Sequence, residues 1–251
     1  MLNKMLSSIG IGAAKVDTQL YQTSYTVGEE LAGKIVIKGG KTEQQIDRLY
    51  LSLMATYEVE KDDHKYTQKA EIEKYQLSEA FLIQPDEVKE IPFSFQLPFD
   101  VPITKGRTRA WIQTGLDIKN AVDPQDQDYI DINPHPLVLE FLQTVNQLGF
   151  RLREVECKKA SASVRKRFPF VQEFEFKPIS GEFRSKLDEL EAIFYVSRDE
   201  IEVLLQIDRR ARGFGIFEAL GLDESFVRFT YDKGDLPSLS SRLTNLIRQH
   251  S

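Results

Sequence analysis

The sequence predicts a mainly β protein of two β-sandwich domains, with a short helix between them and an amphipathic helix at the C-terminus. Three observations support this prediction. Apolar residues recur at every second position through the first two thirds of the chain, turn-forming residues separate these runs, and two later stretches show helical spacing instead. The length of 251 residues is enough for two sandwiches, each with its own core.

The first domain is predicted to span residues 1–133. Strict alternation marks strands within 16–20 and 31–37, whereas 46–59 is apolar on both faces and is predicted to be a central strand covered on both sides. Residues 61–65 form a polar hairpin loop in this interpretation, and 69–82 fits either a polar edge strand or a helix. Further strands are predicted at 91–97, 109–118 and 129–132.

The second domain is predicted to span residues 134–235. Two prolines, Pro134 and Pro136, break the strand pattern, so we place the hinge near 119–136. Apolar residues then follow 3.6-residue spacing, which predicts a helix over 137–148 that ends at Gly149 and plugs one end of a sandwich. Strands follow within the ranges 150–154, 168–176, 193–196, 201–207 and 227–231.

The last segment, 236–251, is predicted to be an amphipathic helix. Its apolar stripe consists of Leu239, Leu243, Leu246 and Ile247. Burying such a stripe contributes roughly 1.5 to 3 kcal/mol per side chain, so we expect it to be covered. The stripe could be buried against the protein's own chain, against a second copy of the chain, or against a partner protein, and the sequence leaves all three open.

Charge and composition restrict the function. The formal net charge of −6 disfavours nucleic acid as a partner, because phosphates would be repelled. A single cysteine, Cys157, excludes an intrachain disulfide and a thiolate metal cluster, and fits a reducing cytoplasm. The sequence contains neither a secretory signal pattern nor a run of about 20 apolar residues, so we expect no stable membrane insertion and a cytoplasmic location.

Several segments together resemble a known family. These are Gly28-Glu29-Glu30-Leu31-Ala32-Gly33, Phe95-Gln96-Leu97-Pro98, Trp111 to Ile118, Ile9 to Thr18, and Asp208-Arg209-Arg210-Ala211-Arg212-Gly213. Their order and spacing resemble the stage-zero M family of bacterial sporulation-control proteins, which is similar to arrestins in fold. The resemblance covers nearly the whole chain. It implies two hinged arrestin-like sandwiches and a regulatory, non-enzymatic role, with no catalytic residues to carry over. We expect no cofactor.

The acidic loop residues are the metal candidates. Asp123, Asp126 and Asp128 offer the hard oxygen ligands that calcium prefers, although the calcium-loop spacing with its terminal Glu is absent. Solvated loop charge and ion pairs with basic residues of the second domain are the alternatives that the sequence favours. No Ser, His and acid pattern and no His pair at ligand spacing is found, so we assign no catalytic residue.

Two further groups are candidates for interactions. Arg209, Arg210 and Arg212 offer guanidinium forks suited to phosphorylated protein segments or to buried ion pairs between the domains. Met5 and Leu6 belong to an N-terminal stretch with helical spacing that fits packing on the protein itself, on a twin subunit, on a partner groove or on a membrane surface.

From these observations we expect a non-enzymatic regulatory or scaffold protein that binds other proteins, with its apolar terminal helices mediating docking or self-association. A strand supplied by a partner can add to an exposed sheet edge. The competing function is a small-ligand or carbohydrate-binding sandwich module or an enzyme module, which would need an aromatic platform or convergent carboxylates; Trp111 is the only tryptophan. A purely structural homodimer is the third alternative.

Overall fold

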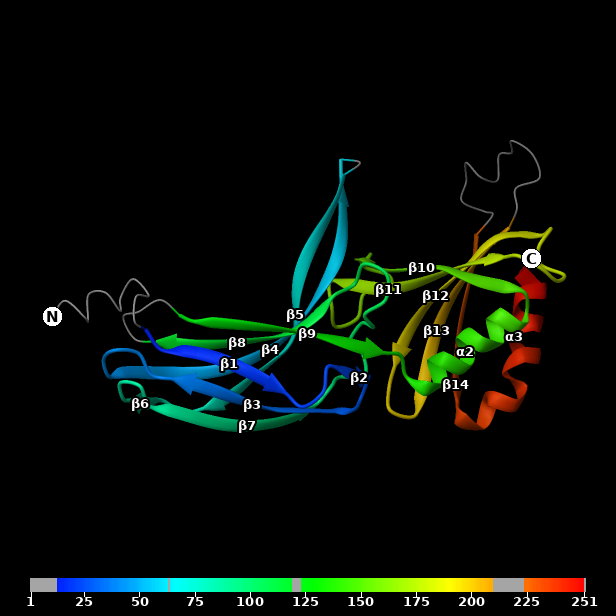
Figure 1. The fold of residues 1–251 in the computed structure, drawn as a ribbon. Coiled ribbons are helices and arrows are strands. Elements are labelled where there is room, and N and C mark those ends of the chain that lie inside the picture. The colour runs from blue at the N-terminus through cyan, green and yellow to red at the C-terminus, as the bar shows by residue number, and fades with distance from the viewer. Residues whose placement is uncertain (1–12, 63, 119–122, 210–223, 251) are drawn as a thin grey trace. The chain divides into compact units, whose positions relative to one another are not determined.

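The computed structural model describes residues 13–62, 64–118, 123–209 and 224–250 and has the mainly β fold with a C-terminal helix that the sequence predicts (Figure 1). The elements are β1 (Lys15–Leu20), β2 (Ser24–Thr26), β3 (Glu30–Lys38), β4 (Gln44–Lys61), β5 (His64–Ser78), β6 (Phe81–Ile83), β7 (Val88–Gln96), β8 (Ala110–Ile118), β9 (Gln125–Asn133), α2 (Pro136–Gln147), β10 (Phe150–Lys159), β11 (Phe170–Pro178), β12 (Leu187–Val196), β13 (Glu200–Arg209), β14 (Glu224–Asp232), the 3-10 turn η2 (Lys233–Asp235) and α3 (Leu236–His250).

The chain divides into two compact units whose main boundary lies between Asn133 and Pro134. Segments 57–67 and 105–108, which lie within the predicted first domain, belong to the second unit. These segments are the tip of the β4–β5 hairpin and the loop before β8. The C-terminal helix, predicted as a segment of its own, is part of the second unit.

The first unit is built from two sheets. One has the strand order β1-β3-β7, and the other contains β4-β8-β9-β2, with β5 and β6 pairing with β4. Fully buried side chains from β3 and β4 lie between these layers, among them Leu31, Ile35 and Ile37 of β3 and Leu49 and Leu51 of β4. Burial of these alternating faces fixes the strand register, since a slip of one residue would expose every buried side chain.

The ambiguous segment 69–82 is extended for most of its length. It is occupied by the end of β5, which pairs with β4, and by β6. Ala70 and Ile72 are buried at alternate positions of β5, and Ser52 of β4 donates a 2.8 Å hydrogen bond to Glu71. Lys74 lies 4.0 Å from the ring centroid of Tyr50, so the second face of β4 is covered by long polar side chains of β5.

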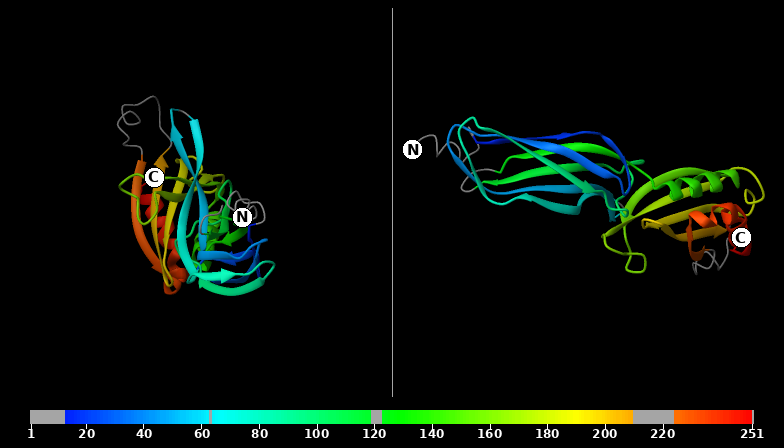
Figure 2. Two further views of the ribbon diagram at one scale, coloured as in Figure 1. Left: turned by 90° about the vertical axis from the view of Figure 1, so that its left-hand side faces the viewer. Right: turned by 90° about the horizontal axis from the view of Figure 1, so that it is seen from below.

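The second unit contains a five-stranded antiparallel sheet in the order β14-β13-β12-β11-β10. One face is covered by α2 and α3, which also contact each other (Figures 1 and 2). Phe174, Leu190 and Leu205 are among the buried side chains. In this unit two amphipathic helices thus cover the face that a second sheet would cover in a two-sheet sandwich, because their apolar stripes supply the core.

Both helices have local signals at their ends. Pro136 is the first residue of α2, and the His135 side chain accepts a 3.2 Å hydrogen bond from the Leu137 amide. After α2 the chain turns at Gly149, whose φ of +94° is strained for residues with a Cβ atom. A capping box of Asp232 and Asp235 precedes α3. Within the described ranges, neither helix is long and apolar enough to cross a membrane.

Candidate functional site

Two of the predicted metal ligands accept hydrogen bonds from backbone amides of the first unit. Asp123 accepts a 2.9 Å hydrogen bond from the Ile118 amide, and Asp126 accepts a 2.6 Å hydrogen bond from the Thr18 amide of β1. No group of three His, Cys, Asp or Glu side chains among the described residues is arranged to hold a metal ion. These carboxylates therefore bind backbone amides between neighbouring strands and turns.

Among the three predicted ligands, Asp128 has a strongly raised pKa. Burial, the negative charge of Asp126, a side-chain hydrogen bond with Asp126 and the charge of Asp17 together raise its pKa to about 6. Its Oδ2 is buried without a hydrogen-bond partner. A carboxyl in this setting retains its proton to a higher pH than an exposed aspartate does.

The apolar stripe of α3 is covered by its own chain. Leu239, Leu243 and Ile247 are at most 1% exposed, and Leu246 is half-buried. Of the three covers that the sequence left open, the protein's own chain is the one observed for these three side chains, because α2 and β14 of the same unit contact α3. The expected docking of a second copy or a partner therefore does not involve them. Removing residues 236–251 would open the core of the second unit.

The other predicted interaction residues lie partly outside the described residues. Met5, Leu6, Arg210 and Arg212 belong to segments that the structure does not describe. Arg209 is exposed at the end of β13. Phosphate binding by this arginine group stays a prediction.

The single tryptophan and the single cysteine do not form reactive or binding surfaces. Trp111 is 1% exposed, with Lys69 5.2 Å from its ring centroid, so its face is not available as a platform for a sugar. Cys157 is buried, and burial raises its pKa to about 12. Thr108 lies 3.4 Å from its sulfur. A thiolate nucleophile is disfavoured at this position.

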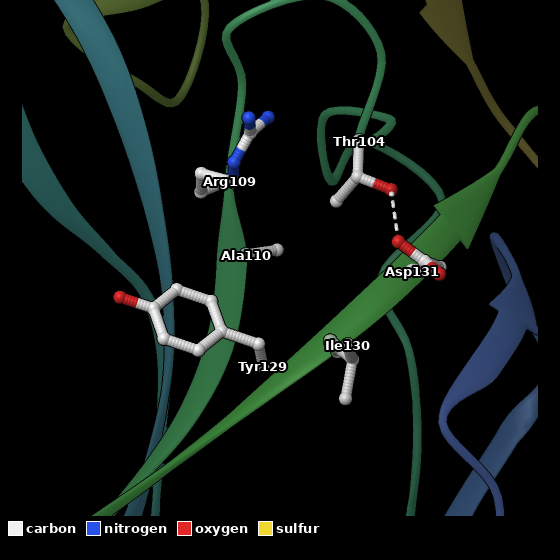
Figure 3. Close-up of a pocket in the computed structure, with 6 residues that line it drawn as sticks. All are labelled: Thr104, Arg109, Ala110, Tyr129, Ile130 and Asp131. Atoms are coloured by element: carbon white, nitrogen blue, oxygen red, sulfur yellow. Dashed lines mark hydrogen bonds between the residues drawn. The ribbon is translucent and has the colours of Figure 1, made fainter.

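A pocket of about 380 Å³ lies on the first unit (Figure 3). Its lining residues are Thr104, Arg109, Ala110, Tyr129, Ile130 and Asp131. Thr104 and Asp131 point toward each other at 3.5 Å, and the Thr104 hydroxyl also accepts a 2.8 Å hydrogen bond from the Ile132 amide. These hydrogen bonds join β9 to the loop that precedes β8. The polar groups of this pocket therefore have a structural role.

The sheet of the second unit has a second face, opposite to the helices, which we call the outer face. Strand register places three glutamates in one row across it, because Glu154 lies opposite Glu175 and Glu175 lies opposite Glu191. In the neighbouring row Glu156 lies opposite Glu173. Like charges directly opposite in a sheet are destabilising, so this acidic pattern costs stability unless cations offset it.

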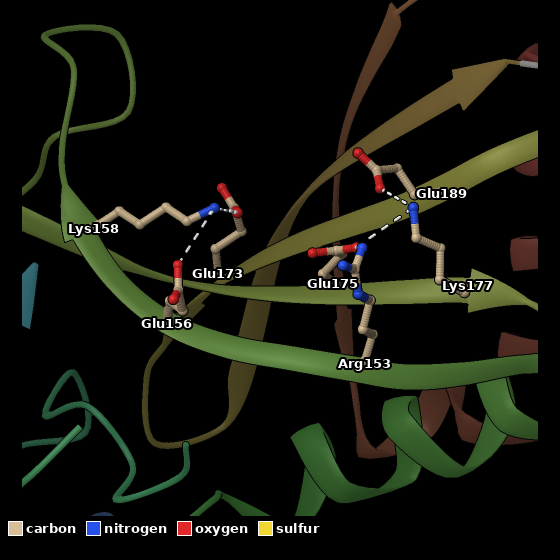
Figure 4. A network of polar contacts seen from close by, with 7 residues as sticks. All are labelled: Arg153, Glu156, Lys158, Glu173, Glu175, Lys177 and Glu189. Carbon is tan, nitrogen blue, oxygen red and sulfur yellow. Dashed lines mark hydrogen bonds and ion pairs between the residues drawn. The ribbon is translucent and has the colours of Figure 1, made fainter. Parts of the chain in front are cut away.

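Lysine and arginine side chains offset part of this charge (Figure 4). Lys158 is hydrogen-bonded to Glu173 and lies 4.0 Å from Glu156, and Arg153 donates a 2.7 Å hydrogen bond to Glu175. Lys177 donates a 2.5 Å hydrogen bond to Glu189. Arg153, Lys158 and Lys177 thus pair with glutamates of the neighbouring strands on this sheet.

Glu191 differs from its neighbours. Among the described residues it makes no hydrogen bond or ion pair, and burial together with the charges of Glu173 and Glu189 raises its pKa to about 7. It lines a pocket of about 290 Å³ between residues 161–164 and the outer face. Val171, Ile193, Leu204 and Phe226 form the apolar part of this pocket.

This site was not predicted from the sequence, although one signal was present. Glutamates occupy every second position at 173 and 175 and again at 189 and 191, which predicts two acidic strand faces. Only the register of β11 against β12 shows that the two faces adjoin and that Ile193 and Leu204 lie beside them.

The comparisons with known proteins agree with one another. The family model described as SpoOM protein matches residues 2–211. The chain is 43% identical over 235 residues to the sporulation-control protein spo0M of Bacillus subtilis (strain 168), which covers 93% of this chain and 91% of that protein. It also superposes on the crystal structure of Spo0M from Bacillus subtilis with a TM-score of 0.87 and 40% identity, covering 96% of this chain and 100% of the other. The chain belongs to the Spo0M family.

Proposed function

We propose that this protein is a non-enzymatic regulatory protein that acts in the cytoplasm by binding another protein through the outer face of its second unit. The regulatory role is supported by the relative named a sporulation-control protein, with 43% identity over most of both chains. Binding by the outer face rests on one observation: a pocket with an apolar part and an unpaired carboxylate lies on a sheet face that no described helix covers.

The chemistry of the face favours a protein ligand over a sugar. Phe226 is 59% exposed and lines the same pocket as half-buried Ile193, together with lysine and glutamate side chains. Such a mixture of an aromatic anchor with a polar rim is typical of protein interfaces. The carbohydrate alternative loses its main support, because Trp111 is buried.

The test is recovery of bound proteins from the native host with tagged chains expressed at their natural level. We expect a protein partner to be enriched with the wild type and lost with Phe226→Asp, which places a charge in the apolar part of the pocket. Leu139→Asp is the matched control, because Leu139 is an exposed apolar residue, 42% exposed, on α2.

Two outcomes would contradict the proposal. The same proteins recovered with Phe226→Asp and with Leu139→Asp would exclude the outer face as the binding surface. Recovery of the chain alone, with a dimer mass in solution, would support the structural homodimer instead. Folding of each variant is checked by its far-ultraviolet circular dichroism spectrum.

A further inference from the structure

We propose that the pocket beside Glu191 binds the side chain of an arginine or lysine that a partner protein presents. The inference rests on the proposed function, since it names the chemistry of the group that the outer face would recognise. It is derived from the shape of the pocket, the register of the sheet and the distribution of charge on the outer face.

The apolar part of the pocket suits an aliphatic stem. Strand register places Glu173, Ile193, Leu204 and Arg228 in one row across β11 to β14, and Glu175, Glu191, Gln206 and Phe226 in the next. Ile193 and Leu204 are therefore next to Gln206 and Phe226 on the same face, with Glu191 at one side. A lysine or arginine side chain buries its methylene groups on such a surface while its charged end reaches an acid.

The acidic part of the pocket suits the charged end. The glutamates around it are Glu156, Glu173, Glu175, Glu189 and Glu191, whereas the cations in contact with them on the sheet are Arg153, Lys158 and Lys177. Lys65 adds one further ion pair, at 3.6 Å from Glu156. Glu191 forms no ion pair or hydrogen bond among the described residues, although the charge of Lys158 partly offsets the rise in its pKa. The Oε1 of Glu156 is buried without a hydrogen-bond partner.

The electrostatics favour a cation over an anion or a neutral group. The charged residues of the pocket lining are Lys158, Lys159, Glu173 and Glu191. Lys158 is already paired with Glu173, so a negative ligand would compete with Glu173 for this lysine and would approach the Glu191 carboxylate. A neutral apolar side chain would leave the Glu191 carboxylate buried further without a partner, which costs free energy. A cation instead forms a charge-assisted hydrogen bond with Glu191 and reduces the repulsion along the row of glutamates.

The first experiment uses N-acetyl-arginine methylamide as the probe, with the full chain labelled for amide-resolved NMR. We expect saturable shifts at residues 161–164 and 191–193, with a dissociation constant on the order of 1 mM, which is typical of a ligand of this size. The citrulline analogue has nearly the same shape without the charge, and we expect it to bind at least about tenfold more weakly. N-acetyl-lysine methylamide with a free side-chain amine is tested beside it.

The variant that tests the site is Glu191→Gln, with Glu154→Gln as its control. Glu154 is exposed on the same outer face and is outside the pocket lining. We expect loss of arginine binding in Glu191→Gln only. Wild-type affinity should rise about fivefold to tenfold from pH 6 to pH 8, because ionisation of Glu191 is required, and this slope should vanish in the variant.

Failure of this inference is distinguishable from failure of the proposed function. Equal binding of the arginine and citrulline probes, or binding that survives in Glu191→Gln, overturns the inference even when a protein partner is recovered through the outer face. Binding of the arginine probe with no recoverable protein partner leaves the pocket chemistry intact and refutes the proposed function. Tighter probe binding in an Arg210→Gln/Arg212→Gln double variant would identify the chain's own arginines as competitors and overturn the assignment to a partner.

Discussion

Glu191 of β12 lies directly opposite Glu175 of β11 in an antiparallel ladder, and Glu191 has no paired cation among the described residues. The pairing places two acids side by side on the outer face. Because the folded state raises the pKa of Glu191 to about 7, above the usual value near 4.5, the folded state retains a proton that the unfolded chain releases at lower pH.

The first prediction concerns the stability of Glu191→Gln. Since the raised pKa lies in the folded state, the stability from this group is present below about pH 4.5 and is lost as the pH rises to 7. We expect the variant to be more stable than the wild type by about 1 to 2 kcal/mol at pH 8, after allowance for partial exposure, and equal to it near pH 4. Urea unfolding at the two pH values measures the difference. An unchanged difference across this range would contradict the electrostatic explanation.

The second prediction concerns Asp128 in the first unit. Its pKa of about 6 lies above the usual 3.8, so its contribution to stability is present below about pH 4 and is lost as the pH rises through 6. Asp128→Asn keeps a donor for Asp126 without the charge, and we expect it to raise stability by about 1 kcal/mol at pH 7.5. Thermal unfolding at pH 7.5 and pH 4 provides the measurement. Asp47→Asn, at an exposed position of β4, is the control and should change little.

The third prediction concerns the core under α3. Leu243 is 0% exposed, so Leu243→Ala leaves a cavity, and we expect a loss of about 2 to 5 kcal/mol in the free energy of unfolding. Leu246→Ala is the control, because Leu246 is half-buried on the same helix, and it should cost less than half as much. Chemical denaturation, followed with a spectroscopic probe in the second unit, measures the free energy of unfolding of both variants. Equal losses would show that the stripe is less buried than described.

The fourth prediction concerns the contact between β14 and α2. The Tyr231 hydroxyl donates a 2.8 Å hydrogen bond to the Leu137 carbonyl, and burial raises the Tyr231 pKa. We expect Tyr231→Phe to cost about 1 kcal/mol and to speed amide exchange in the first turn of α2. Tyr66→Phe, at a position 51% exposed in the β4–β5 hairpin, is the control. Wild-type exchange rates in α2 would refute a role for this bond.

Local sequence patterns predicted most elements because each depends on neighbouring residues. The helix predicted at 137–148 is α2, Pro136–Gln147, since Pro136 presets the first turn and the apolar residues repeat at 3.6-residue spacing. The helix predicted from Leu236 is α3. Segment 69–82 was ambiguous because its polar residues carry no strong period; its pairing with β4 decided that it is extended.

The sequence by itself determined the mainly β fold and the two predicted helices, because alternation, proline positions and helical spacing are properties of the chain alone. Tertiary structure decided what covers the stripe of Leu239, Leu243 and Ile247, and it decided which glutamates adjoin Ile193 and Phe226 on the outer face. Both depend on contacts between strands and helices far apart in the chain, and the register that brings them together is set by burial of the whole sheet face.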